Sequence, residues 1–172
     1  MIISKNMIFY RQIRTFLFLV LLTTSATFCK TQKKDSLPQA TGFVNDFEKI
    51  FTASQENYLD SMIRAYEEKT TIQIALITVD TSMISRKDFD DYILKIANAW
   101  GVGQKEKNNG ITIGISKGYH TLRIQNGDGI EKLLPDADTK AIIDTAFIRS
   151  FKKEQYFEGT VNGLETIMNK LH

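Results

Sequence analysis

Three carboxylates and two glycines lie close together between positions 125 and 136. They are Asp128, Glu131 and Asp136, together with Gly127 and Gly129. Glycine permits backbone angles that residues with a Cβ avoid, and clustered carboxylate oxygens are the ligands that calcium prefers. The pattern is typical of a turn that binds a cation, but an ordinary acidic turn has the same composition.

The overall charge gives no indication of a nucleic-acid partner. The 172 residues include 22 basic and 20 acidic side chains, and three of the basic ones lie in the first 29 positions. The remainder is therefore nearly neutral, whereas a nucleic-acid binder shows a basic patch. A single cysteine excludes a disulfide within the chain, and two histidines are too few for a zinc site of the usual kind.

Residues 1–29 have the pattern of an export signal. A positively charged start precedes the apolar run Thr15 to Leu22, and small residues follow. The run is too short to span a bilayer comfortably, which favours cleavage over a retained anchor. Two mature starts are open: a cut after Ala26, or a lipid anchor at Cys29, where a lipoprotein cysteine would stand. We expect an exported protein, in the periplasm or anchored to a membrane and facing the cell exterior.

Residues 30–42 are a polar linker, and residues 43–172 predict one α/β domain. Apolar spacing gives the element order α-β-α-β-β-α-α. We expect helices at about 52–69, 85–100, 136–147 and 161–171, and strands at 72–79, 111–116 and 121–125. The Thr52 and Gln55 pair predicts a capping box, and Asp136 or Asp138 is expected to cap the third helix.

The predicted topology is a central mixed β-sheet with helices on both faces. The first two strands, joined by a helix, predict a right-handed parallel crossover, and a hairpin adds an antiparallel strand. Loops 101–110 and 126–136 then lie at the same edge of the sheet. We therefore expect oxygen-bearing side chains from both loops to converge there: Asn108, Asn109, Asp128, Glu131 and Asp136.

Two other motifs have better structural explanations. Residues 114–118 match the G-x-S-x-G pattern of a hydrolase nucleophile, but that motif needs a helix after it, and here a strand is expected. The Asp136 and Asp138 pair resembles a phosphatase nucleophile, but acidic residues at the start of a helix are favoured by the helix dipole.

Four ordered motifs together resemble the TPM domain. They are Val44-Asn45-Asp46, Ala99 to Gly103, Asn108 to Ile111, and Gly127 to Glu131 with Leu134-Pro135-Asp136. The resemblance covers about residues 43–171. It implies an α/β sandwich, calcium binding and, in some members, weak phosphomonoesterase activity; other members are accessory factors for membrane complexes. Carried over by position, the implied metal ligands are Asp46, Asn109, Glu131 and Asp136.

Two departures from the family pattern change the local charge. The family usually shows Asp-Asn-Gly where this chain has Asn108-Asn109-Gly110, and an aromatic residue where Asp128 stands. We therefore include Asp128 among the candidate ligands. Three functions stay open: an exported calcium-binding accessory factor for a membrane or envelope protein, a weak metal-dependent phosphatase using the same acidic site, or a structural domain without a ligand.

Overall fold

The computed structural model describes residues 37–172. The predicted export signal and Cys29 lie outside the described residues, as does the first part of the linker. The strands are β1 (Val44–Asp46), β2 (Gln73–Thr78), β3 (Gly110–Ser116) and β4 (Thr121–Asn126). The helices are α2 (Ala53–Thr70), η1 (Arg86–Asp88), α3 (Phe89–Trp100), α4 (Asp128–Glu131), α5 (Asp136–Ile142), the π-helical η2 (Ile143–Phe147), α6 (Ile148–Phe151) and α7 (Tyr156–Lys170).

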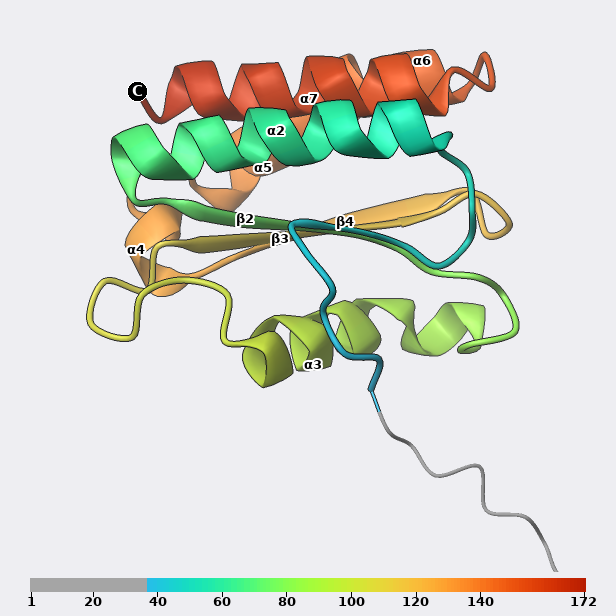
Figure 1. The fold of residues 1–172 in the computed structure, drawn as a ribbon, viewed down its shortest axis with the longest axis horizontal. Helices are drawn as coiled ribbons and strands as arrows, with labels where there is room; N and C mark the ends of the chain where they lie inside the picture. Colours follow the sequence, from blue (N-terminus) through green and yellow to red (C-terminus); the bar gives the residue numbers. More distant parts are fainter. Residues whose placement is uncertain (1–36) are drawn as a thin grey trace, which may run out of the picture. The chain divides into compact units, whose positions relative to one another are not determined.

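The four strands form one mixed sheet (Figure 1). Their order in it is β1-β2-β3-β4. β1, β2 and β3 are parallel, and β4 is antiparallel to β3. In this register Gln73 lies opposite Gly110 at one end of β2, and Thr78 lies opposite Asp46 at the other end. Loops that precede β3 or follow β4 therefore meet at one edge of the sheet, while residues that follow β1 lie at the opposite edge.

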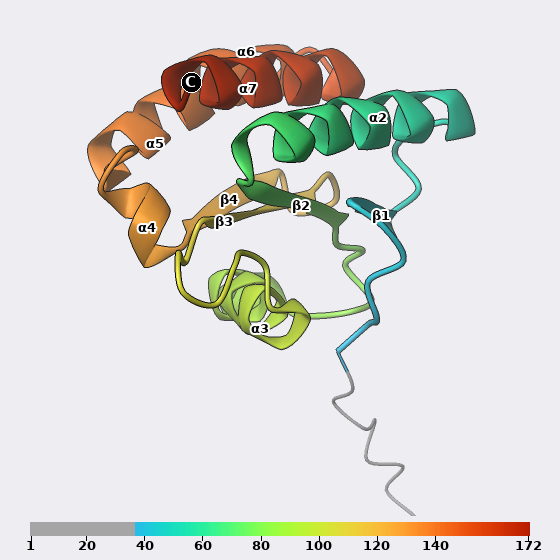
Figure 2. The ribbon, with the colours of Figure 1, turned by 60° about the vertical axis from the view of Figure 1, so that its left-hand side comes forward.

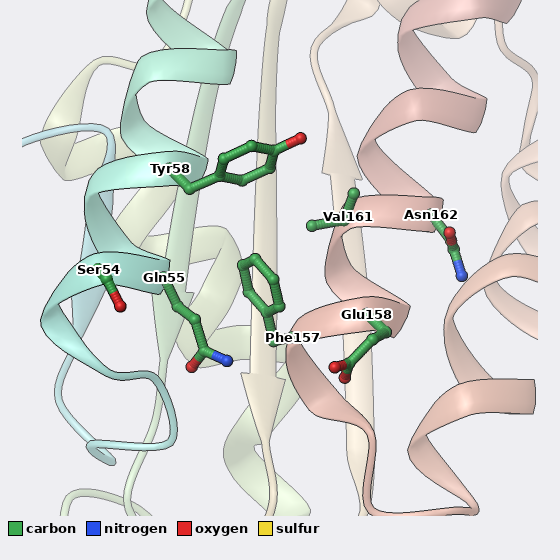
Figure 3. Close-up of a pocket in the computed structure, with 7 residues that line it drawn as sticks. All are labelled: Ser54, Gln55, Tyr58, Phe157, Glu158, Val161 and Asn162. Atoms are coloured by element: carbon green, nitrogen blue, oxygen red, sulfur yellow. The ribbon is translucent and has the colours of Figure 1, made fainter.

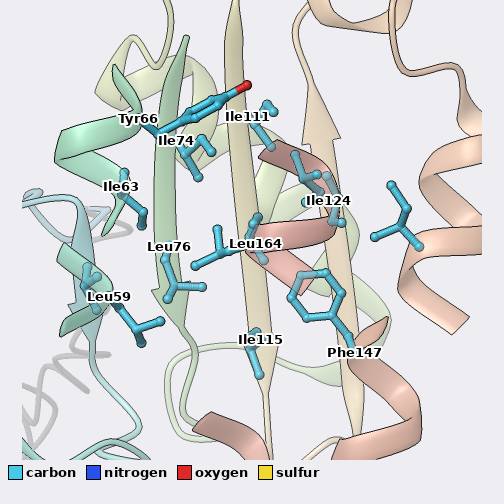
Figure 4. Packing of buried hydrophobic residues seen from close by; sticks show 14 of the residues in the cluster. Leu59, Ile63, Tyr66, Ile74, Leu76, Ile111, Ile115, Ile124, Phe147 and Leu164 are labelled. Carbon is cyan, nitrogen blue, oxygen red and sulfur yellow. The ribbon is translucent and has the colours of Figure 1, made fainter. Parts of the chain in front are cut away.

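Helices cover both faces of this sheet, as the sequence predicts (Figure 2). One face packs against α2, α5 and α7 and forms the larger core, which includes Leu76, Ile115 and Phe147 (Figure 4). The other face packs against α3, where Ile93 and Ile96 contact Ile77. β-Branched side chains suit such a sheet because it is buried on both sides. Among the described residues, no helix is long and apolar enough to cross a membrane.

Several helix ends are those that the sequence predicts. Thr52 caps α2, its side chain accepts from the Gln55 amide, and Gln55 accepts in return from the Thr52 amide. Gly101 ends α3 in the left-handed conformation. The prediction of an aspartate cap on α5 is wrong, because Pro135 occupies the N-cap position and both Asp136 and Asp138 lie in the first turn.

Two elements differ from the sequence-based expectation. β1 was not expected, because it has three residues and two of them, Asn45 and Asp46, are rarely found in strands. α7 begins at Tyr156 and not near 161. Gly159 and Gly163 weaken the helical signal, but a Cβ at Gly163 would come 2.0 Å from the Phe147 ring, so close packing requires glycine.

Candidate functional site

The two loops that the topology places at one edge are in direct backbone contact. The Gly127 amide donates to the Gly110 carbonyl over 2.8 Å, and the Gly129 amide donates to the Asn108 carbonyl over 3.1 Å. A Cβ at Gly129 would come 2.1 Å from the Lys107 carbonyl oxygen. The two glycines therefore allow the loops to approach closely. The expected unusual backbone angle is not observed at Gly127, where φ is −78°.

A polar pocket of about 250 Å³ lies between these loops and the C-terminal half of α3. The Asp128 side chain is exposed, and this residue lines the pocket with Asn108, Gln125 and Thr112. Thr112 is 1% exposed, and its hydroxyl has no hydrogen-bond partner in the described part of the chain. A buried polar group is usually paired, so the pocket contains an unsatisfied oxygen next to a carboxylate-bearing loop. Sequence reasoning did not identify Thr112, which stands in an otherwise apolar strand.

Buried amide side chains hold both loops in place. The Asn109 oxygen accepts from the Gln104 amide over 2.8 Å, and its Nδ2 donates to the Thr71 carbonyl over 2.6 Å. The Asn126 Nδ2 donates to the Leu134 carbonyl and to the Thr139 hydroxyl, at 3.1 and 2.9 Å. The Asn109 oxygen, a predicted ligand, therefore has a role in fixing loop 101–110.

Asp46 does not join the other predicted ligands. It lies opposite Thr78, at the end of the sheet away from Gly110. Its two oxygens accept hydrogen bonds from the Ile50 amide at 3.2 Å and the Phe51 amide at 2.8 Å. These bonds shape the connection from β1 to α2. The short strand β1 is what places Asp46 there, because a parallel neighbour of β2 ends where β2 ends.

The remaining predicted ligands follow one another along the loop edge. Glu131 is exposed at the end of α4, and Asp136 is exposed at the start of α5. Asp138, two residues further, pairs with Lys170 of α7 over 3.1 Å. Within residues 37–172, no three His, Cys, Asp or Glu side chains are grouped as a metal cage. The five predicted ligands thus do not form one preassembled site, and Asp128 is the one that lines the pocket.

Other hollows of the domain lie away from this pocket, and two of them have mixed apolar and polar linings. A groove between α2 and α7 has Tyr58 and Phe157 on its walls, with their rings edge-to-face at 5.8 Å (Figure 3). Glu158 is the one ionisable carboxylate that lines it. A second hollow, of about 240 Å³, lies at the β3–β4 turn beside α6 and includes Ser116 and His120. Neither hollow is lined by a residue of loops 101–110 or 126–136, which meet beside Asp128.

The four-stranded mixed sheet lies between two helical layers, and two loops pack through glycines at one edge. The chain is therefore an α/β domain of the sandwich type. The sequence profile of the TPM domain family matches residues 44–170. The chain therefore belongs to the TPM domain family, as its four motifs predict. No curated protein sequence matches the chain significantly.

Solved structures share the fold. The N-terminal domain of a protein from P. gingivalis is 27% identical with a TM-score of 0.68, over 76% of this chain and 82% of that one. The BA42 protein from the psychrophilic bacterium Bizionia argentinensis is 22% identical with a TM-score of 0.62, over 73% and 83%. The N-terminal domain of cg2496 from Corynebacterium glutamicum is 14% identical with a TM-score of 0.58, over 80% and 84%. The last two likenesses concern the fold alone.

Proposed function

We propose that this chain is an exported accessory domain that binds calcium weakly in the pocket beside Asp128. The observation that carries the proposal is the unpartnered Thr112 hydroxyl, which is buried in a pocket that Asp128 and Asn108 also line. Carboxylate, amide and hydroxyl oxygens are the donor set that calcium accepts. Asp128, Asn108 and Thr112 are the residues that would hold the ion.

The arrangement favours low affinity. Asp128 is the one carboxylate that lines the pocket, and calcium affinity rises with the number of ligand charges. Glu131, three residues further along α4, is a neighbour of Asp128 on the helix surface. We expect a dissociation constant of about 10⁻⁴ to 10⁻³ M, as in extracellular calcium modules. The pocket is lined by no histidine, lysine or arginine that could act as a base or bind phosphate, which favours calcium binding over the alternative phosphomonoesterase activity.

Thermal unfolding with calcium, magnesium or a chelator tests this proposal. Calcium at about ten times its dissociation constant adds roughly 1.4 kcal/mol of stability by mass action, which raises Tm by a few degrees. Asp128→Asn should abolish the rise. Asp144→Asn is the matched control, because Asp144 is exposed, pairs with Lys140 and does not line the pocket. An unchanged wild-type melting curve in calcium would refute the site.

The accessory role rests on the export pattern of residues 1–29. The proposed partner is a membrane or envelope protein, and a lipid at Cys29 would hold the domain near it. Mass spectrometry of envelope material tests this, with a mature chain expected to begin at Thr27 or at a lipidated Cys29. A chain that retains Met1 and stays in the cytoplasm would contradict the proposed location.

A further inference from the structure

The hollow at the β3–β4 turn combines apolar walls with hydrogen-bond donors. Its walls are Ile148, Phe151 and the ring of Tyr156, whose ring centroid lies 4.7 Å from that of Phe151. Its polar lining consists of Ser116, His120, Thr121, Lys152 and the same Tyr156. No carboxylate lines it. This composition differs from that of the pocket beside Asp128, where an acidic side chain and amides predominate.

Several of these donors have no acceptor in the described residues. Ser116 is 1% exposed, and its oxygen accepts from the Tyr119 amide at 3.4 Å, while its own O–H donates to no group within residues 37–172. Burial raises the pKa of Tyr156, and the charges of Glu154 and Glu48 raise it further, so its hydroxyl stays protonated. The hollow is therefore lined by donors that include the Tyr156 hydroxyl, the Thr121 hydroxyl and the Lys152 ammonium, and by no acidic side chain.

The carboxylates near this hollow are occupied by other partners. Glu154 forms an ion pair with Lys117 at 3.1 Å. Glu48 accepts from the Lys117 and Gly118 amides, at 2.7 Å each, and so closes the hairpin turn. Lys152 is exposed and takes part in none of these bonds. Its positive charge is therefore available to a ligand, and charge-assisted hydrogen bonds are the strong ones.

We propose that this hollow binds a small organic anion, in which a carboxylate is carried on an apolar body. The apolar body packs on Ile148, Phe151 and the Tyr156 ring, and the carboxylate accepts from Lys152 and the hydroxyls. The volume of about 240 Å³ lies below the range of about 300–1,000 Å³ that is usual for drug-sized ligands. The ligand is accordingly about the size of a single substituted ring or a short aliphatic chain.

Amide NMR titration with benzoate tests the proposal. We expect shifts confined to residues 116–121 and 148–156, with a dissociation constant of about 1 mM or below. Benzamide, which has the same shape without the charge, should bind at least about tenfold more weakly, since a charged hydrogen bond is worth about that factor. Inorganic phosphate, which lacks the apolar body, should also bind more weakly. Equal binding of benzamide or of phosphate would overturn the proposal.

Two substitutions separate a site from a surface effect. Lys152→Gln should weaken benzoate binding about tenfold, whereas Lys153→Gln, at an exposed position that does not line the hollow, should leave it unchanged. Amide spectra of the free variants report whether each one is folded. A lack of benzoate shifts in the folded wild type, or equal losses in both lysine variants, would refute the site.

Discussion

The carboxylate of Asp46 accepts a hydrogen bond from the hydroxyl of Thr78, directly across the β1–β2 pair. The same Thr78 oxygen accepts from the Glu48 amide over 2.9 Å. One pair of side chains therefore ties the edge strand to its neighbour and turns the chain toward α2. The aspartate of the Val44-Asn45-Asp46 motif therefore has a structural role far from the loop edge. Its carboxylate holds the backbone between β1 and α2 in place.

Asp46→Asn should lower the free energy of unfolding by about 1–3 kcal/mol. In asparagine, one of the two oxygens that accept from the Ile50 and Phe51 amides becomes an NH2 group, so that a donor faces a donor. Chemical denaturation measures the loss. Asp144→Asn, which removes an exposed ion pair with Lys140, should cost less than about 1 kcal/mol. A variant Asp46→Asn as stable as the wild type would show that these bonds contribute little.

Thr112→Val should raise stability without calcium by up to about 1 kcal/mol, because it removes a buried hydroxyl that has no partner. The same change should reduce the calcium-dependent rise in Tm. Thr160→Val is the comparison, since Thr160 is equally buried but donates to the Tyr156 carbonyl over 2.8 Å. A destabilised Thr112→Val would show that the hydroxyl has a partner, and would count against a calcium site that uses it.

Gly163→Ala should destabilise the domain even though alanine is the better helix former. Propensity favours alanine by about 1 kcal/mol, but its Cβ would lie 2.0 Å from the Phe147 ring. Overpacking of this kind costs about 1–3 kcal/mol. Asn162→Ala, at the exposed neighbouring position, should be neutral or slightly stabilising. Denaturant unfolding of the two variants compares them, and a stabilised Gly163→Ala would mean that the Phe147 ring moves aside easily.

Glu56→Gln should stabilise the domain at neutral pH. Burial raises the pKa of Glu56 above its ordinary value of 4.5, and the charge of Asp46 raises it further. The folded state therefore binds this proton more tightly than the unfolded state, and wild-type stability falls as pH rises from 4.5 through the raised pKa. The glutamine variant escapes that loss, which is below about 1 kcal/mol for an incompletely buried group.

The pH profile distinguishes this effect from a change in helix propensity. The advantage of Glu56→Gln should disappear below pH 4.5, where the wild-type carboxyl is protonated in both states. Glu68→Gln, an exposed position on the same helix, is the control. Unfolding curves measured across this range check the sign. An advantage that persists at low pH would assign the effect to something other than titration.

The elements with strong local patterns were predictable from the sequence, but the hydrogen-bond partners of individual side chains were not. The capping box at Thr52, the stripe of α3 and the two loops at one edge follow from periodicity and turn chemistry. Nothing near Asn109 in sequence indicates that its amide is held by Thr71, 38 positions earlier. β1 is likewise defined by its partner β2, because three residues contain too little pattern to predict a strand.

The approach of the chain to α3 determines how the domain responds to being held. The Trp100 indole donates to the Pro38 carbonyl over 2.8 Å, and Leu37 packs in the cluster around α3. Helices α2 and α7 lie on the other face of the sheet from α3 (Figure 2). Tension applied from the N-terminal side is borne first by the Trp100 contact and then by the hydrogen bonds of β1.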